Sequence, residues 1–535
     1  MSNKVDTAPQ IGKDVIESLT LGMYEDCRFI YREYIQNAAD AVDKAIDYAL
    51  LEKGQEAIHV RIDKDNRRIS IQDNATGISK DKVMAILRNI AHSTKKRGED
   101  KGFRGIGRLG GLGYCSKLIF ETSCNGESVK SVMTWDAELL KYIINDRENI
   151  EEATEVLSRV TKLETEKEDC DAHYFNVIME DVSSDELLDV ESVHDYLSMV
   201  APVDICSSFI YRQKINDFKK EHGLTVDTYN IFVNEDQIYK PYTSVIYEDN
   251  NGGKKKVDDI IDVKFLMAKD DTGSIIYWGW YSISTLKGQM KPKNLARGIR
   301  LRKENIQIGD EEICKKFFTK TEDQRFSFYY FGEIHALSKE LIPNSRRDYF
   351  GESKVCVEFE QKIRQDFLKL KELCYDAQKL RSSTSTIAKT EELRATIQEK
   401  EKNGYTSQKE RDDLQHRLVE QEKKEEQAQK QLENVKNKIS SKDSPLKTVL
   451  DKFEISTSKV EKEHSKKDVE EKAPSKENKT KYRTDKPIYS KYSKNEKKLI
   501  GKIYTAIGNA IADERLREAL ISNIEPVGGI NLVHT

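Results

Sequence analysis

The segment from residue 31 to residue 41 reads Tyr-Arg-Glu-Tyr-Ile-Gln-Asn-Ala-Ala-Asp-Ala, and its polar side chains recur at helical spacing. Glu33, Asn37 and Asp40 occupy positions i, i+4 and i+7, which lie along one stripe of a helix. The chain therefore places two carboxylates and a carboxamide side by side near its start. A solvated polar helix face would show the same spacing, so the interpretation depends on residues further along the chain.

Three further blocks come after this segment. Residues 73–78 read Asp-Asn-Ala-Thr-Gly-Ile, residues 92–95 read His-Ser-Thr-Lys, and residues 102–113 contain six glycines. Dense glycines permit backbone N–H groups to converge on phosphate oxygens. The residues before them are polar, which excludes a Rossmann fingerprint because that motif comes after a buried strand. In isolation, the first block would be an ordinary Asp-Asn turn and the last a flexible loop.

Together and in this order, the four blocks resemble the ATP site of the GHKL superfamily, which includes gyrase B, Hsp90, histidine kinases, MutL and MORC proteins. In motif style the sequence is most similar to MORC-like and Hsp90-like ATPases. The resemblance implies an α+β fold built on a Bergerat-type ATP-binding sandwich, with ATP and Mg²⁺ bound and ATP hydrolysed slowly. One departure is Ala75, which stands where the family's Asp-x-Gly-x-Gly pattern has its middle glycine.

The side chains of the polar stripe have the chemical groups that ATP hydrolysis requires. Glu33 has the carboxylate needed to orient and deprotonate the attacking water, and Asn37 offers a carbonyl oxygen, a hard ligand that Mg²⁺ prefers. The resemblance assigns the matching residues these roles and implies a supporting role for Asp40. A buried Asp73 can accept the exocyclic amine of adenine, and Gly77 lets backbone approach the base closely.

Phosphate contacts are expected from the two later blocks. The resemblance places Ser93, Thr94 and Lys95 where the family's lid meets phosphate, and a hydroxyl and an ammonium suit that position. A solvated charge run is the alternative for Lys95, because two more basic residues come directly after it. In GHKL proteins the glycine segment closes over the triphosphate, and its candidate contacts here are Gly102, Arg104, Gly105, Gly107 and Gly110.

With 535 residues the chain is too long for one core. Helix-like and strand-like patterns alternate through residues 11–205, and we assign residues 1–205 to the ATP-binding domain. Further strand candidates predict a second α+β domain at residues 206–350, which the resemblance identifies as an S5-like transducer. Within it, the stretch at residues 331–341 is expected to be helical and to end before Pro343.

The rest of the chain is polar. Residues 351–440 are nearly free of Gly and Pro and predict a long helical arm, a helical hairpin or coiled coil whose two helices meet at Asn403-Gly404. Ser407 and Glu410 have the spacing of a capping box for the second helix. Residues 441–493 are rich in Lys, Ser and Glu and predict a flexible charged linker, and residues 494–535 predict a small C-terminal helical module.

Hydrolysis coupled to movement requires a basic residue outside the ATP-binding domain to sense the γ-phosphate. In GHKL relatives the transducer supplies it, and the basic loop at residues 287–300 is the candidate, with Lys287 or Arg297 as the sensor. A surface basic loop would have the same composition. A second polar cluster, at residues 344–348, is interpreted more simply as packing against the helical arm.

Eight cysteines without a Cys-x-x-Cys pair indicate neither a zinc site nor a disulfide framework, and a reducing compartment fits best. The first ten residues lack the apolar core of a secretory signal. No apolar run approaches the roughly 20 residues that cross a bilayer. We therefore expect a cytoplasmic protein with no membrane partner.

These features favour an ATP-driven clamp in which two N-terminal domains of a homodimer associate when ATP binds. MORC-like action on DNA is the leading hypothesis, because residues 472–498 hold ten Lys or Arg against three Asp or Glu, with interleaved tyrosines. A disordered linker explains the same composition. The alternatives are an Hsp90-like chaperone acting on protein clients and a non-hydrolysing nucleotide-dependent scaffold. Partner proteins would bind the helical arm or the C-terminal module.

Two GHKL classes fit the chain poorly. A histidine kinase is disfavoured because the ATP domain stands at the start of the chain rather than after a helical phosphoacceptor domain. A type II topoisomerase is disfavoured because no cleavage domain with a catalytic tyrosine is recognisable after residue 350.

Overall fold

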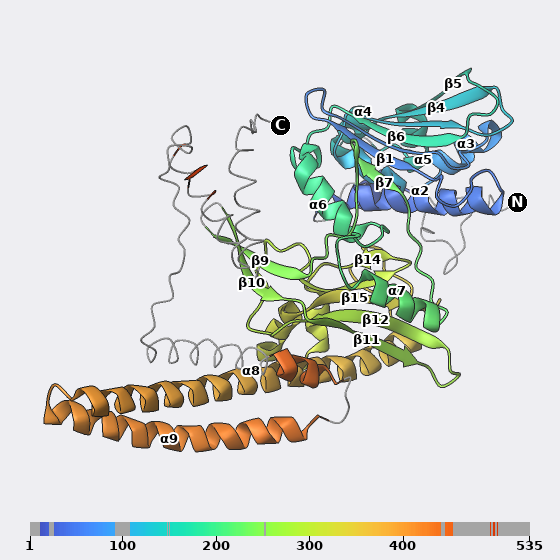
Figure 1. The fold of residues 1–535 in the computed structure, drawn as a ribbon. Helices are drawn as coiled ribbons and strands as arrows, with labels where there is room; N and C mark the ends of the chain where they lie inside the picture. Colours follow the sequence, from blue (N-terminus) through green and yellow to red (C-terminus); the bar gives the residue numbers. More distant parts are fainter. Residues whose placement is uncertain are drawn as a thin grey trace, which may run out of the picture. The chain divides into compact units, whose positions relative to one another are not determined.

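The computed structural model describes residues 11–20, 26–90, 107–146, 148, 150–250, 253–439 and 444–452, together with 493, 496, 497 and 500. The chain divides into two compact units, Met1–Ser456 and Thr457–Thr535, and the helices and strands described below belong to the first. The predicted C-terminal module and most of the predicted linker fall outside the described residues. In Figure 1 the chain is coloured from blue at the N-terminus to red at the C-terminus.

The N-terminal part of the first unit is built on an eight-stranded mixed sheet. Its strand order is β5-β4-β3-β6-β2-β1-β7-β8, in which β1 and β7 are parallel and the other neighbours antiparallel. The strands are β1 (Ile58–Asp63), β2 (Arg68–Asp73), β3 (Lys117–Ser123), β4 (Val129–Asp136), β5 (Thr161–Lys167), β6 (Tyr174–Glu180), β7 (Ile231–Val233) and β8 (Asp236–Gln237). The predicted boundary at residue 205 falls before the last two of these strands, because a short apolar run does not reveal which sheet it will join.

Helices pack against this sheet. They are α1 (Asp14–Thr20), α2 (Phe29–Asp47), α3 (Lys80–Leu87), α4 (Ala137–Asn145), α5 (Ala153–Val160) and α6 (Val190–Val200), and α7 (Arg212–Glu221) comes next in the chain. The predicted helix at residues 31–41 lies within α2, whose apolar residues Ile30, Ala39 and Val42 are fully buried in the shared core. Asp40 of the polar stripe is also buried, so the stripe is shielded by protein and does not form an open solvated face. The 3₁₀ helix η1 (Gly107–Gly113) packs directly on α2.

A second sheet of five strands has the order β11-β12-β15-β13-β14. Its members are β11 (Asp262–Lys269), β12 (Ile275–Ile283), β13 (Gly298–Lys303), β14 (Ile306–Ile308) and β15 (Phe331–Ala336), and β9 (Val245–Asn250) and β10 (Gly253–Asp259) form a separate hairpin. The expectation of a helix at residues 331–341 is wrong, because Phe331–Ala336 is the central strand β15. All six residues of β15 are buried, so the run lacks the alternation that distinguishes a strand from a buried helix.

The predicted helical hairpin is present as α8 (Lys354–Asn403) and α9 (Gln408–Asn437). Gly404 ends α8 with a φ of 92°, and the Ser407 side chain accepts a hydrogen bond from the Glu410 amide, which confirms the expected break and cap. The first half of α8 does not belong to the arm alone, since Phe359, Ile363 and Phe367 are fully buried in the core of the second sheet.

Part of the segment predicted as a linker is also packed. Residues 445–452 are helical, and Leu446, Val449 and Leu450 are buried in the core formed by the second sheet and α8. These apolar residues are at helical spacing, but the Lys-rich residues around them led us to predict a linker. Among the described residues, no helix is both long and apolar enough to span a membrane.

Candidate nucleotide site

The carboxylate of Glu33 lies between two arginines, one from its own helix and one from the second sheet domain. Its Oε1 is 3.5 Å from Nη2 of Arg32 and 3.7 Å from Nε of Arg347, and its side chain is only 12% exposed. Charges in such a shielded position attract more strongly than at the surface. The contact therefore joins a candidate general base on α2 to a cation more than three hundred residues away in the chain.

Arg347 is presented by a tight turn. Its φ of 55° lies in the left-handed region, and its carbonyl accepts a hydrogen bond of 2.8 Å from the amide of Gly309. Arg32 binds the same turn by donating to the carbonyl of Arg346 at 3.4 Å. Burial lowers the pKa of Arg347 and Glu33 opposes that shift, so the guanidinium stays charged. A left-handed non-glycine residue held against a carboxylate is the kind of local strain that accompanies functional sites.

The polar cluster at residues 344–348 thus faces α2, and its interpretation as packing against the helical arm is corrected for Arg347. The turn, the first turn of α2 and α6 also line a cleft of about 790 Å³. This space separates parts of the two sheet domains beside the contact between Glu33 and Arg347.

The described part of the glycine-rich segment packs closely on α2. A Cβ atom at Gly107 would lie 2.3 Å from Oε2 of Glu33, and one at Gly110 would lie 3.0 Å from the ring of Phe29. A Cβ at Gly111 would lie 2.6 Å from the hydroxyl of Tyr34. From the sequence we expected these glycines to bind phosphate, and the structure shows that they also bring the backbone close to side chains of α2.

Asp73 ends β2 as a buried carboxylate. It is 3% exposed, and its Oδ1 accepts a hydrogen bond of 3.0 Å from the amide of Ala75. Burial raises the pKa of Asp73 to about 7, although hydrogen bonds from the backbone of Ala75 and Phe175 act in the opposite direction. A carboxylate kept from water in this way has a strong free-energy reason to bind a donor such as an amine.

The turn after Asp73 is sealed onto the neighbouring strands. Gly77 has a φ of 61°, and a Cβ there would lie 1.8 Å from the carbonyl oxygen of Ser123 at the end of β3. Ala75, which replaces the family's middle glycine, is fully buried, and its carbonyl lies 2.8 Å from Nδ1 of His173. The alanine therefore has a packed place in the turn, and Gly77 is the position where only glycine fits.

The other predicted residues are distributed over both domains. Asn37 is half-buried on α2 one turn beyond Glu33, and Asp40 is buried on the same helix. Ser93, Thr94, Lys95, Gly102, Arg104 and Gly105 lie outside the described residues. Lys287 is exposed, and the guanidinium of Arg297 lies 3.5 Å from the ring centre of Phe328 and 3.9 Å from Glu312. The sequence did not single out Arg347, because nothing in it joins residue 347 to residue 33, and its only signal was an Arg-Arg pair in a polar turn.

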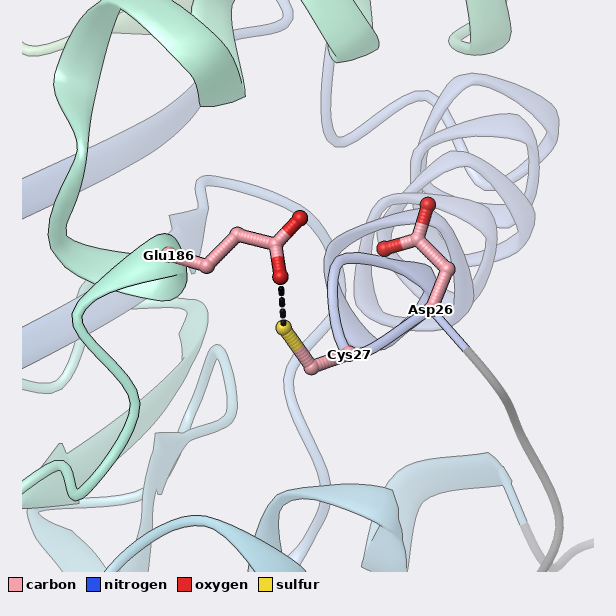
Figure 2. Close-up of side chains that lie close together, drawn as sticks. All are labelled: Asp26, Cys27 and Glu186. Carbon is pink, nitrogen blue, oxygen red and sulfur yellow. Dashed lines mark hydrogen bonds between the residues drawn. The ribbon is translucent and has the colours of Figure 1, made fainter.

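A second cluster near the start of α2 has the donor atoms of a metal site. The ligand atoms of Asp26, Cys27 and Glu186 lie within 4.8 Å of one another, and Cys27 Sγ is 3.4 Å from Glu186 (Figure 2). Arg28 already pairs with both acids, at 3.0 Å from Asp26 and 3.3 Å from Glu186. Burial raises the pKa of the Cys27 thiol, so the group is a poor metal ligand, and we assign no ion to this cluster.

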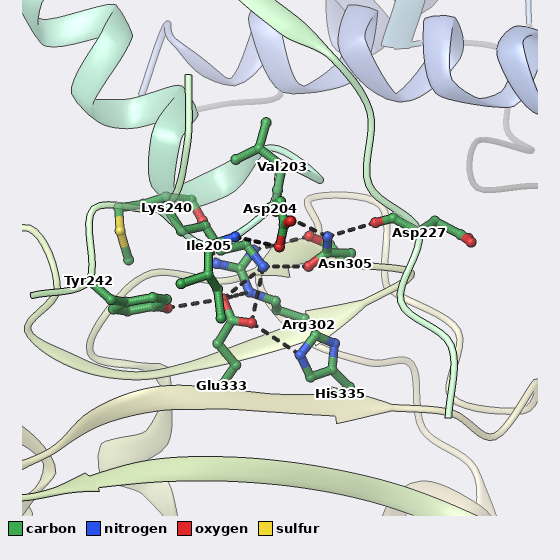
Figure 3. A network of polar contacts seen from close by, with 11 residues as sticks. Val203, Asp204, Ile205, Asp227, Lys240, Tyr242, Arg302, Asn305, Glu333 and His335 are labelled. Carbon is green, nitrogen blue, oxygen red and sulfur yellow. Dashed lines mark hydrogen bonds and ion pairs between the residues drawn. The ribbon is translucent and has the colours of Figure 1, made fainter. Parts of the chain in front are cut away.

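A buried ionic network holds the second sheet against the end of the first domain. Figure 3 shows Lys240, Arg302 and His335 converging on Glu333, at 2.9, 2.6 and 3.1 Å. Arg302 also donates a hydrogen bond of 2.8 Å to the carbonyl of Met199, the penultimate residue of α6. Because these side chains are almost completely buried, the network ties β13 and β15 firmly to α6.

Part of the chain is similar in sequence to known proteins. Residues 27–169 match the family described as "Histidine kinase-, DNA gyrase B-, and HSP90-like ATPase". The N-terminal domain is therefore a GHKL-type ATPase domain. It has distant similarity to the N-terminal region of HtpG/Hsp90 proteins.

Three relatives illustrate that similarity. The chain is 33% identical over 139 residues to "Chaperone protein HtpG" of Anaplasma phagocytophilum (strain HZ), which covers 22% of each chain. It is 29% identical over 163 residues to the protein of that name from Enterobacter sp. (strain 638), covering 27% of this chain and 26% of the relative. It is 28% identical over 178 residues to that of Rickettsia typhi (strain ATCC VR-144 / Wilmington), covering 29% and 28%. The chain thus spans about a quarter of the length of these relatives.

Proposed function

We propose that this protein binds ATP with Mg²⁺, hydrolyses it, and uses the cycle to drive a dimeric clamp. The observation that carries the proposal is the contact between Glu33 on the ATPase domain and Arg347 on the second domain. It brings a carboxylate able to act as a base beside a cation able to offset phosphate charge, and it makes the second domain part of the site.

The residues present fit the nucleotide. Asp73 is buried and accepts hydrogen bonds, as recognition of an adenine amine requires. Asn37 offers a carbonyl oxygen to Mg²⁺ on the stripe that holds Glu33. The missing side chain of Gly107 leaves backbone directly against the Glu33 carboxylate. Bound Mg²⁺ would neutralise part of the charge on the phosphate oxygens.

In the proposed reaction, Asp73 accepts the adenine amine, and Asn37 would hold the Mg²⁺ that accompanies the phosphates. Glu33 accepts the proton of the attacking water. Arg347, which pairs with Glu33 in the structure, turns to the terminal phosphate, a stronger anion at the same place. Its withdrawal from Glu33 leaves that carboxylate free to act as the base and reports the nucleotide to the second sheet domain.

Steady-state phosphate release with Mg²⁺ tests this proposal. Glu33→Ala should bind ATP and lower kcat by about 10²-fold or more. Arg347→Ala should lower kcat by about 10²-fold or more, whereas Arg346→Ala, which alters an exposed side chain of the same turn, should stay near wild type. Lys287→Ala and Arg297→Ala belong in the same series. Normal turnover of Arg347→Ala with loss of turnover in either of these would transfer the sensor role to the basic loop.

Similarity to HtpG chaperones favours a second proposal about the target, an Hsp90-like action on protein clients. The MORC-like proposal, a clamp on DNA, depends on the motif style and on the basic composition of residues 472–498. ATP-dependent suppression of client aggregation would support the chaperone, and salt-sensitive retention on DNA would support the DNA clamp. Tight ATP binding with no turnover would support the nucleotide-dependent scaffold instead.

A further inference from the structure

Tyr34 stands next to Glu33 on α2 and is enclosed in the domain core. Its side chain is 2% exposed, and its hydroxyl makes two hydrogen bonds to η1. It donates to the carbonyl of Arg108 at 3.0 Å and accepts from the amide of Gly111 at 3.1 Å. In a 3₁₀ helix, residues three apart are the natural carbonyl and amide partners. One hydroxyl therefore binds both polar groups of a single turn of η1.

Gly111 makes this arrangement possible. Any side chain there would begin 2.6 Å from the Tyr34 hydroxyl and 2.9 Å from the sulfur of Met179, so the site accepts only glycine without rearrangement. Burial raises the pKa of the Tyr34 hydroxyl far above its ordinary value, so the group remains protonated and able to donate at any physiological pH.

The first residue of η1, Gly107, lies against the carboxylate of Glu33. Gly107, one residue before Arg108, is the glycine whose Cβ would strike Oε2 of Glu33. Consecutive residues of α2 thus face two glycines of η1, Glu33 opposite Gly107 and Tyr34 opposite Gly111. The side chain of Arg108 extends the connection by donating to the carbonyl of Asn89, just beyond α3. A shift of η1 would move the backbone that borders Glu33.

We propose that Tyr34 is a positioning residue for ATP hydrolysis, whose hydroxyl fixes η1 so that the Gly107 backbone holds the Glu33 carboxylate in its working orientation. This inference rests on the proposed ATPase function. It acts through geometry alone, because the Tyr34 hydroxyl is buried and binds the backbone of η1. Displacement of a catalytic group by about 1 Å can cost about 10²-fold in rate, so loss of the two hydrogen bonds that hold η1 should be visible in kcat.

Tyr34→Phe removes the hydroxyl and keeps the ring. Tyr31→Phe is the matched control, because Tyr31 is also fully buried on α2 and its hydroxyl donates to a backbone carbonyl, that of Leu187, at 2.6 Å. Tyr34→Phe removes two buried hydrogen bonds and Tyr31→Phe removes one, so both should lose thermal stability, but only Tyr34→Phe loses contact with η1. We expect kcat of Tyr34→Phe to fall about tenfold with the Kd for ATP unchanged within about threefold, and Tyr31→Phe to retain the wild-type kcat.

Gly107→Ala gives a second measurement, since its methyl group displaces Glu33 directly. If Tyr34 acts through Gly107, the double variant Tyr34→Phe/Gly107→Ala should be no slower than Gly107→Ala alone. Wild-type kcat in Tyr34→Phe, an equal loss in Tyr31→Phe, or independent multiplication of the two effects would overturn the inference. Absence of Glu33-dependent turnover in the wild type would instead overturn the proposed function, so the two failures are distinguishable.

Discussion

At the scale of single residues, the ionised form of Asp73 is destabilised by burial in the free protein, and a hydrogen-bond donor would offset that cost. A carboxylate with a pKa near 7 in the folded protein holds a proton that it would lose in the unfolded chain between about pH 4 and pH 7. Folding stability from this group therefore falls as the pH rises through that window, and the penalty is complete above pH 7. A strongly shifted pKa of this kind is typical of functional sites, here one proposed to bind an amine.

We predict that Asp73→Asn abolishes ATP binding yet stabilises the free protein. The gain should be on the order of 1–4 kcal/mol at pH 8 and small at pH 4, because asparagine has no charge to bury and can still accept from the Ala75 amide. Thermal unfolding of both proteins across this pH range measures the difference, and isothermal titration measures ATP binding. A stability difference that does not vary with pH would contradict the burial argument.

At the scale of elements, β13 and β15 are joined to α6 by charges rather than by apolar contacts alone. Glu333 is surrounded by Lys240 and Arg302, and burial lowers the pKa of Lys240 to about 7 despite the nearby carboxylate. Paired buried charges of this kind contribute little net stability. Removal of one partner is nevertheless destabilising, because the desolvation of the remaining charge is no longer offset. The network therefore enforces one arrangement of these elements.

We predict that Glu333→Gln destabilises the protein by about 3–5 kcal/mol, since it leaves the buried guanidinium of Arg302 without a counter-charge and Lys240 without its carboxylate partner. Glu322→Gln is the control, because the pair of Glu322 with Lys320 is exposed and should be worth less than about 1 kcal/mol. Urea unfolding followed by tryptophan fluorescence suits this test, as Trp278 and Trp280 lie in the adjoining strand β12. The additional change Lys240→Met should recover part of the loss, and equal effects of Glu333→Gln and Glu322→Gln would count against the network.

At the scale of the whole molecule, the proposed clamp requires association that depends on nucleotide. We predict that Glu33→Ala, which should bind ATP without hydrolysing it, accumulates as a dimer in ATP and as a monomer in ADP or without nucleotide. Sedimentation velocity at micromolar protein reads the mass directly. Asp73→Asn, which should not bind ATP, is the matched control and should stay monomeric. The same measured mass with and without nucleotide in every variant would contradict the clamp.

The local features were those the sequence could predict. The stripe of α2, the end of α8 at Gly404 and the Ser407 cap depend on residues a few positions apart, whose contacts result from helical geometry. The GHKL class was predicted as well, since the order of its motifs is a property of the chain. The roles of single site residues stay predictions until the variants are measured.

Tertiary structure alone decided what meets across the fold. The contact of Arg347 with Glu33, the entry of β7 into the first sheet, and the identity of β15 as a strand depend on neighbours that are distant in the chain. Glycine density likewise looks the same in the sequence whether it serves phosphate or close packing, and only the fold shows Gly107 against Glu33 and Gly111 against Tyr34. Local patterns report how a segment folds, but a site is made by packing, which brings together residues that have no relation along the chain.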